Sequence, residues 1–186
     1  VAGKMISKSF SVPATDLEEI LARNCHISDT ARAARFCRQA EQARYFCKDI
    51  HYPDVPLHTP TFDTTLLSAH IRPGHVMLID CWASWCGPCR AAIPAVKALY
   101  DKYDRDRFDV ISISLDSKKE DWQKALEEEK MPWPQFIAGN RGYEQLTLRY
   151  NINSIPNLIL IDDKGQVVCN TFSPEEISIE LEEILR

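Results

Sequence analysis

The fold of this 186-residue chain is decided by a short stretch with two cysteines, Trp85-Cys86-Gly87-Pro88-Cys89. The continuous apolar run 76–79 precedes it and is typical of a strand that is covered on both faces. After it, apolar residues recur with helical spacing to about residue 104. The sequence therefore predicts a buried strand, a tight turn that carries both cysteines, and a helix that begins at Cys86.

Two cysteines with this spacing at the start of a helix can form an internal disulfide with little movement of the backbone. The N-terminus of a helix favours an anion, so Cys86 should form a thiolate readily and act as the nucleophile. Cys89 lies one turn further into the helix, where it should be less exposed and should resolve a mixed disulfide. With Trp85, Gly87 and Pro88 as the rest of the active-site turn, the pattern predicts thiol–disulfide exchange without a cofactor.

Other uses of the cysteine pair remain open from these residues, among them a purely structural role. A structural zinc site needs four ligands, but Cys25, Cys37 and Cys47 are separated by 12 and 10 residues, unlike a zinc knuckle, so we expect no metal. A thiol peroxidase would carry Thr or Ser three residues before its cysteine, where this chain has Ala83. The pair could also be secondary to a redox-linked protein-interaction module.

An acidic residue lies in the predicted buried strand, six residues before the first cysteine. Burial in an apolar strand raises the pKa of a carboxyl group, so Asp80 could exchange a proton near neutral pH. Placed beneath the cysteine pair, it could take the proton from Cys89 during resolution. The alternative is an aspartate at a strand end that local hydrogen bonds hold in place.

A proline marks the start of another predicted strand, in the segment Ser154-Ile155-Pro156. Proline cannot donate to a sheet ladder and belongs at a strand start. If the Ile155–Pro156 bond is cis, the backbone of Ile155 should face the active site and could pair with an extended substrate segment. The alternative is an ordinary trans proline that opens the strand.

Strands and helices alternate along the rest of the chain after residue 74. We expect strands at 108–115, 135–137, 157–161 and 166–169, and helices at 118–129, at 143–150 and after an N-cap at Ser173. Residues 56–74 look like a loop, and 162–165 like a hairpin turn. This order predicts an α/β fold with a mostly parallel sheet that ends in one antiparallel hairpin.

The N-terminal region differs from the rest in charge and in pattern. Residues 1–50 have a net charge of +2 (eight Lys and Arg against six Asp and Glu), whereas the remainder has −7. We expect helices over about 16–24 and about 28–50, and we divide the chain into an N-terminal helical extension, 1–55, and a second domain, 56–186. Cys37 and Cys47 would lie about 15 Å apart on one helix and cannot bridge each other; buried thiols, or a bridge from Cys25 to one of them, are the alternatives.

Composition narrows the partners and the cellular compartment that we expect for the chain. The formal net charge is −5, which argues against a nucleic-acid partner. No segment has the roughly 18–20 apolar residues that span a bilayer. Because the sequence begins Val1-Ala2 rather than with Met, we expect a processed product from which an export signal has been removed.

The stretch 78–90 resembles the active-site strand and turn of the thioredoxin superfamily, with Cys81 where an aromatic is usual. Three further segments resemble the TlpA/ResA-type thioredoxins of the cell envelope: Arg90-Ala91-Ala92-Ile93-Pro94, Ser112-Ile113-Ser114-Leu115-Asp116 and Pro132-Trp133-Pro134-Gln135. The likeness covers about residues 60–186, although 62–74 match the usual opening poorly.

The resemblance implies a thioredoxin-like fold, a central mixed sheet flanked by helices, with a helix–strand insert and here an N-terminal extension. It places Ile155–Pro156 at the cis-proline position of the superfamily. It also implies disulfide-containing or dithiol protein substrates, an upstream electron donor, and a periplasmic or cell-envelope location, with the cytoplasm as the alternative. Gly87-Pro88 resembles reducing thioredoxins, so a reductase is expected. Many relatives carry Glu where this chain has Ala92, so a specialised role in cytochrome maturation is not expected.

Overall fold

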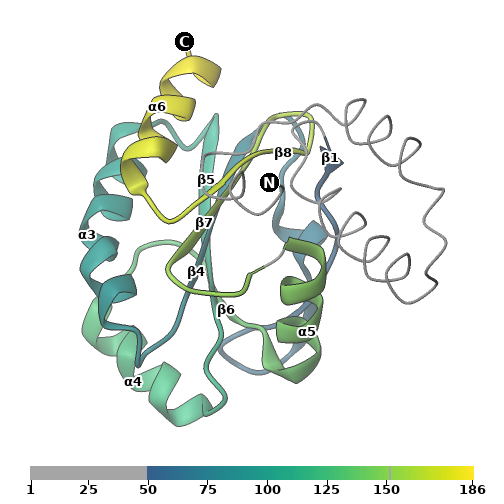
Figure 1. Cartoon of the computed structure of the whole chain (residues 1–186), viewed down its shortest axis with the longest axis vertical. Helices are drawn as coiled ribbons and strands as arrows, with labels where there is room; N and C mark the ends of the chain where they lie inside the picture. Colours follow the sequence, from purple (N-terminus) through teal and green to yellow (C-terminus); the bar gives the residue numbers. More distant parts are fainter. Residues whose placement is uncertain (1–49, 151) are drawn as a thin grey trace, which may run out of the picture.

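A mixed sheet of eight strands forms the centre of residues 50–150 and 152–186, the part of the chain that the structure, a computed structural model, describes (Figure 1). The spatial order is β1-β8-β7-β4-β5-β6-β2-β3. The strands are β1 Ile50–His51, β2 Pro56–His58, β3 Thr64–Leu66, β4 Val76–Trp82, β5 Phe108–Ser114, β6 Gln135–Ile137, β7 Asn157–Ile161 and β8 Gln166–Thr171. The helices are the 3-10 helix η2 Leu67–His70, α3 Gly87–Lys102, α4 Lys119–Glu129, α5 Gly139–Tyr150 and α6 Pro174–Ile184.

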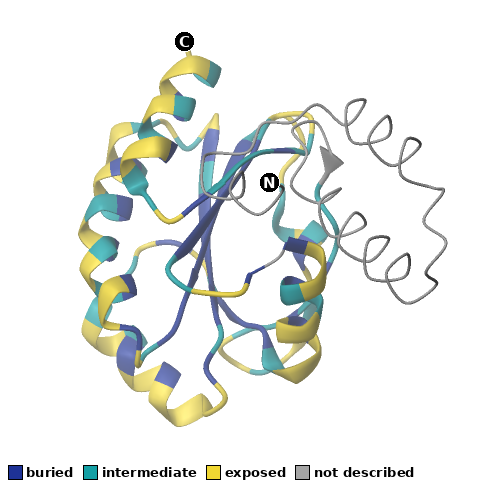
Figure 2. Cartoon of the chain, viewed as in Figure 1, coloured by how far each residue is buried: buried dark blue, intermediate teal, exposed yellow. Residues whose placement is uncertain are grey.

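Strand β4 is the central strand, and all seven of its residues are buried. It pairs in parallel with β5 and antiparallel with β7. Because side chains alternate along a strand, its apolar residues divide between two cores. Met77, Ile79 and Cys81 pack with residues of α5, whereas Val76 and Leu78 pack with residues of α3 and α6. Figure 2 shows the buried strands between helices whose outer faces are exposed.

The strands and helices predicted after residue 74 are largely confirmed, including α3, which begins one residue after Cys86. The expected mostly parallel sheet is wrong: among the described strand pairs only β4–β5 and β5–β6 are parallel, because β7 returns beside β4 in the opposite direction and short antiparallel strands extend both edges. Ser173 caps α6 as expected, with its hydroxyl accepting from the Glu176 N–H, and Pro174 opens the helix. Cys81 is buried in the core, while Cys169 is only half-buried in β8. Helix α5 begins at Gly139 rather than at residue 143.

Two expectations near the start of the described residues are wrong. Residues 56–74, expected as a loop, contain β2, β3 and η2; β2 pairs with β3 and, through His58 and Ile137, with β6. These strands are three residues long, too short for an alternating pattern to show. Ile50, expected on a helix, lies in β1 and pairs with Val167, because the edge of β8 offers backbone partners.

Other predictions for the N-terminal region fall outside the described residues. These are the two helices over about 16–24 and 28–49, the state of Cys25, Cys37 and Cys47, and the extension 1–55 as a domain, which all stay predictions. Among the described residues, no helix is long and apolar enough to cross a membrane. In the same residues, no group of three or more His, Cys, Asp or Glu side chains is placed to hold a metal ion.

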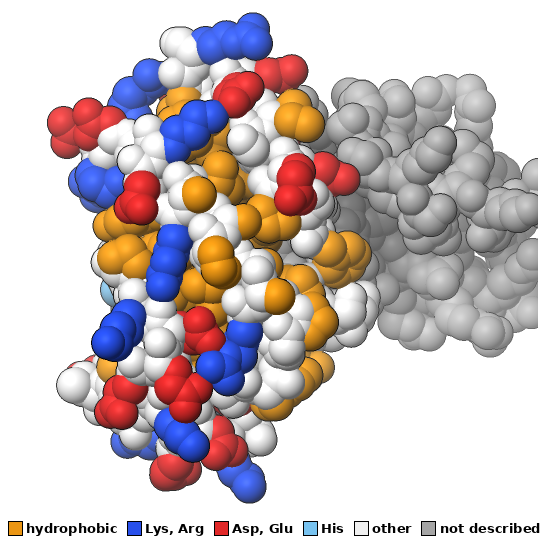
Figure 3. All heavy atoms as spheres, turned by 90° about the vertical axis from the view of Figure 1, so that its left-hand side faces the viewer, with side chains coloured by type: hydrophobic (Ala, Val, Ile, Leu, Met, Phe, Trp, Pro, Cys, Tyr) orange, Lys and Arg blue, Asp and Glu red, His pale blue; other side chains and the backbone are white. Residues whose placement is uncertain are grey.

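Ion pairs join α3 to the helices beside it. Arg90 donates to Glu129 at 2.5 Å and to Glu128 at 2.8 Å in α4, and Lys102 donates to Glu182 at 2.8 Å in α6. Figure 3 shows this side of the molecule, where acidic and basic side chains lie among hydrophobic ones. Exposed pairs of this kind contribute little to stability, so the apolar contacts beneath them hold α3 in place.

Candidate active site

Cys86 and Cys89 form a disulfide at the N-terminus of α3, with their Cα atoms 5.3 Å apart. Cys86 is the N-cap, and its Sγ accepts a hydrogen bond from the Cys89 N–H at 3.2 Å. In the reduced protein the same N–H points at the position where a thiolate charge would develop. The sequence thus correctly places Cys86 where the helix favours an anion.

The disulfide is buried, but the residues around it are exposed. Cys86 and Cys89 are 4% and 2% exposed, a small difference in the predicted direction. Gly87 and Pro88 are exposed, and the Trp85 ring is 69% exposed although it is a large apolar side chain. The exposed residues of the predicted turn therefore border the disulfide on the surface, where a partner can approach the sulfur atoms.

A further carboxylate, Asp116, holds the loop before the disulfide, although no local pattern in the sequence assigns it a role. Asp116 accepts from the Ser84 N–H at 2.8 Å, from the Ser84 hydroxyl at 2.6 Å and from the Ser114 hydroxyl at 2.7 Å. Asp116 is 5% exposed, so these bonds are shielded from water. Asp116 lies in the stretch 112–116 that carries the family resemblance, but only the folded chain brings it to Ser84, 32 residues away. We call Asp116, Ser84 and Ser114 the loop clamp.

Asp80 lies inside β4, on the face that packs against α3, between Leu78 and Trp82. Trp82 belongs to the same apolar cluster as Cys86, Cys89 and residues of α4. Asp80 is 4% exposed and accepts a hydrogen bond from the Ser112 hydroxyl at 2.8 Å. Burial raises the pKa of Asp80 to about 6, and the bond from Ser112 opposes that rise. The partner lies in the next strand, so the alternative of a strand-end aspartate with local bonds does not fit.

The Ile155–Pro156 bond is cis, so the alternative of an ordinary trans proline does not apply. Ile155 packs against the cluster that contains both active-site cysteines. It also lines a groove of about 480 Å³, whose lining includes the exposed Trp85. The other apolar residues of the groove are Leu115, Tyr143 and Ile152. The structure therefore brings together the turn and the proline segment that the sequence singled out separately.

The chain belongs to the thioredoxin-like family, whose members match residues 74–167, about half of the sequence. This range contains the central strands, the disulfide and the cis-proline.

Among named relatives, the chain is 26% identical over 133 residues to the thiol-disulfide oxidoreductase ResA of Geobacillus kaustophilus, which covers 67% of this chain and 75% of the relative. It is 24% identical over 104 residues to the sporulation thiol-disulfide oxidoreductase A of Bacillus subtilis, covering 54% and 61%. The crystal structure of the thioredoxin domain of a thiol-disulfide oxidoreductase from Bacteroides vulgatus superposes with a TM-score of 0.67 at 24% identity, over 75% of this chain and 98% of that one.

These comparisons confirm the TlpA/ResA-like resemblance and the thioredoxin-like fold. Together with the disulfide at the start of α3, they make the chain a thiol–disulfide oxidoreductase.

Proposed function

We propose that the chain reduces disulfide bonds of protein substrates, with Cys86 as the attacking and Cys89 as the resolving cysteine. The observation that carries this proposal is the position of the disulfide. Cys86 caps α3 with its sulfur facing a backbone N–H, beside a groove that has Trp85 and Ile155 on its sides. A substrate segment in that groove would bring its own disulfide next to the cysteine that the helix prepares for attack.

The reaction starts from the dithiol. The Cys86 thiolate attacks one sulfur of the substrate disulfide, a mixed disulfide forms, and the other substrate sulfur leaves as a thiolate that takes a proton from water. Cys89 then loses its proton to Asp80 and attacks the Cys86 sulfur, so the mixed disulfide breaks and the second substrate sulfur leaves as a thiolate that takes a proton from water. Asp80 afterwards returns the proton of Cys89 to water. The substrate gains two electrons and two protons overall, and the protein is left with the Cys86–Cys89 disulfide. A dithiol donor upstream returns it to the reduced form by the reverse exchange.

The role of Asp80 in this scheme is supported by its burial and by its face of the sheet. A general base works best when its pKa lies near the working pH, and the pKa of Asp80 is raised to about 6. Its side chain lies on the α3 face of β4, two residues before Trp82, which packs in the same cluster as the disulfide. An ionised Asp80 can therefore receive a proton that would otherwise have to reach water from a buried cysteine.

The groove supports the choice of an extended protein segment as substrate. Its exposed aromatic residues, Trp85 and Tyr143, offer large apolar surfaces to a substrate. Ile155, half-exposed at the cis-proline, can pair with a substrate backbone in the manner of an added strand. We further propose the cell envelope as the compartment, on the strength of the ResA-type resemblance; cell fractionation should recover the chain with envelope markers, and recovery with cytosolic markers would contradict this.

Insulin reduction by dithiothreitol tests the activity. The protein should accelerate insulin precipitation above the dithiothreitol background, and Cys86→Ser should return the rate to that background. Cys169→Ser, which changes a cysteine in β8 instead, is the matched control and should behave like wild type. A wild-type rate equal to the background would overturn the proposal.

A further inference from the structure

Three side chains form a buried chain of hydrogen bonds that ends at Asp80. The indole N–H of Trp133 donates to the Ser112 Oγ at 2.8 Å, and the Ser112 hydroxyl donates to Asp80 Oδ2 at 2.8 Å. All three are buried: Ser112 is 0%, Trp133 3% and Asp80 4% exposed. Ser112 comes from β5, and Trp133 from the segment before β6.

The chemistry of the donors fixes the direction of these hydrogen bonds. An indole N–H can only donate, so the oxygen of Ser112 must accept from Trp133. A serine hydroxyl has one hydrogen and two lone pairs, so its hydrogen stays available for a different acceptor. That acceptor is Asp80 when the carboxyl group is ionised. Trp133 therefore orients Ser112 without competing for its hydrogen.

A second acceptor lies on the other side of the hydroxyl. The Met131 sulfur is 3.9 Å from the Ser112 Oγ, within reach as a weak acceptor. If Asp80 is protonated, its O–H can donate to the remaining lone pair of Ser112, and the serine hydrogen can turn to the Met131 sulfur. Each polar hydrogen then has an acceptor in both states, and no heavy atom needs to move.

We propose that Ser112, oriented by Trp133, is a positioning residue that gives Asp80 a hydrogen-bond partner in both its ionised and its protonated form. The inference rests on the proposed function of Asp80 as the group that takes the proton of Cys89. A proton acceptor in that role must be satisfied before and after each transfer, because a buried polar group without a partner is costly. Ser112 meets that requirement from one position.

The surroundings of Asp80 hold few other titratable groups among the described residues. Its partner in β7 is Leu158, and α3 contributes Cys89 and Ile93 to the cluster beside it. Cys81 follows it in β4, and the charge of Asp80 adds to the burial that raises the pKa of the Cys81 thiol, although the Cys81 side chain packs in the cluster on the opposite face. The causes of the raised pKa of Asp80 are burial and, in opposition, Ser112, with no charged side chain among them. Removal of the Ser112 hydroxyl should therefore change the titration midpoint of this carboxyl group.

The test is a titration of the Asp80 carboxyl carbon by ¹³C NMR in the oxidised protein, where neither active-site cysteine titrates. The wild-type midpoint should lie at about 6. Ser112→Ala should raise it by about one pH unit or more, because the ionised form loses a charge-assisted hydrogen bond, which is stronger than the neutral bond that the protonated form loses. Ser112→Thr, which keeps the hydroxyl, should restore a midpoint near wild type, and Trp133→Phe should give a smaller rise.

Ser68→Ala is the matched control, since the Ser68 hydroxyl donates to Asp54 at 2.7 Å, in a hydrogen bond of the same kind elsewhere in the structure; it should leave the midpoint of Asp80 unchanged. An unchanged midpoint in both Ser112→Ala and Trp133→Phe would overturn the inference, and Trp133→Phe decides alone if Ser112→Ala does not fold.

The proposed function is judged separately by the pH profile of insulin reduction. If Asp80→Asn leaves that profile unchanged, the proton role of Asp80 fails, whatever Ser112 does. If Asp80→Asn alters it while neither Ser112→Ala nor Trp133→Phe moves the midpoint, only this inference fails.

Discussion

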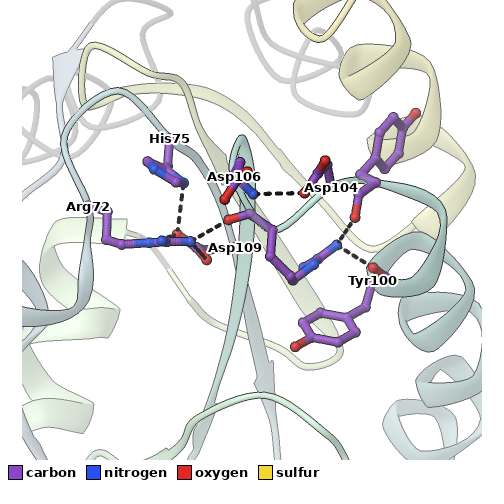
Figure 4. Close-up of polar contacts among 8 residues, drawn as sticks. Arg72, His75, Tyr100, Asp104, Asp106 and Asp109 are labelled. Carbon is purple, nitrogen blue, oxygen red and sulfur yellow. Dashed lines mark hydrogen bonds and ion pairs between the residues drawn. The ribbon is translucent and has the colours of Figure 1, made fainter.

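Two aspartates in neighbouring strands, Asp80 in β4 and Asp109 in β5, lie in opposite electrostatic settings. Asp80 is buried near the disulfide end of the sheet, and its hydrogen-bond partner is the neutral Ser112. Asp109 lies at the other end, where it pairs in register with Met77, and it accepts two hydrogen bonds from Arg72 at 2.5 and 2.7 Å. His75 lies 3.4 Å from it (Figure 4).

The difference shows how one fold gives the same side chain two uses. The aspartate with an arginine partner, Asp109, forms a two-pronged ion pair with Arg72 that ties the loop before β4 to β5. Burial without a positive partner raises the free energy of the ionised form of an aspartate. Its pKa therefore rises, and it exchanges a proton at a pH near neutrality. The following predictions test that contrast.

Asp80→Asn should stabilise the oxidised protein at pH 7.5. The pKa of Asp80 is raised from 3.8 to about 6 in the folded state, so folding binds a proton between these values, and the stability from that proton is present below 3.8 and lost as the pH rises through 6. At pH 7.5 the wild type has lost about 3 kcal/mol that the neutral asparagine retains. Urea unfolding at pH 7.5 and 4.5 measures this; a gain that does not shrink at pH 4.5 would contradict the raised pKa.

Asp116→Ala should destabilise the protein by about 2–3 kcal/mol. Without the Asp116 carboxylate, the Ser84 N–H and the hydroxyl groups of Ser84 and Ser114 lose their hydrogen-bond acceptor. The rate of insulin reduction should fall as well, since Ser84 lies two residues before Cys86. Urea unfolding and the insulin assay give the two numbers. A stability loss with an unchanged rate would mean that the clamp does not position the active-site turn.

Asp109→Asn should have the smallest effect, a loss of about 1 kcal/mol or less, because the side chain of Arg72 is 51% exposed. The loss should fall toward zero when the salt concentration is raised to about 1 M, where exposed charges are screened. Urea unfolding at low and high salt measures this. A gain in stability with rising pH, as expected for Asp80→Asn, would erase the contrast between the two aspartates.

The sequence predicts those parts of the site that depend on local pattern. Cys86 as the helix cap, Asp80 as a buried residue and Pro156 at a strand start all follow from neighbours within a few residues. The loop clamp and the Ser112–Trp133 chain do not, because they join residues 21 to 32 positions apart. Residues 56–74 fail for another reason: Pro56 suggests a loop, yet proline is tolerated at the first residue of a strand, the position it has in β2. Short edge strands form because a neighbouring strand offers backbone partners, which no local pattern reveals.

The central claim is that Cys86 attacks and Cys89 resolves. Trapping the mixed disulfide tests it most directly: reduced Cys89→Ser and reduced Cys86→Ser are each mixed with oxidised insulin, and the products are separated without reductant and identified by mass spectrometry. We predict that Cys89→Ser accumulates an adduct bonded through Cys86, whereas Cys86→Ser accumulates little. An adduct that forms equally well through Cys89 would contradict the account.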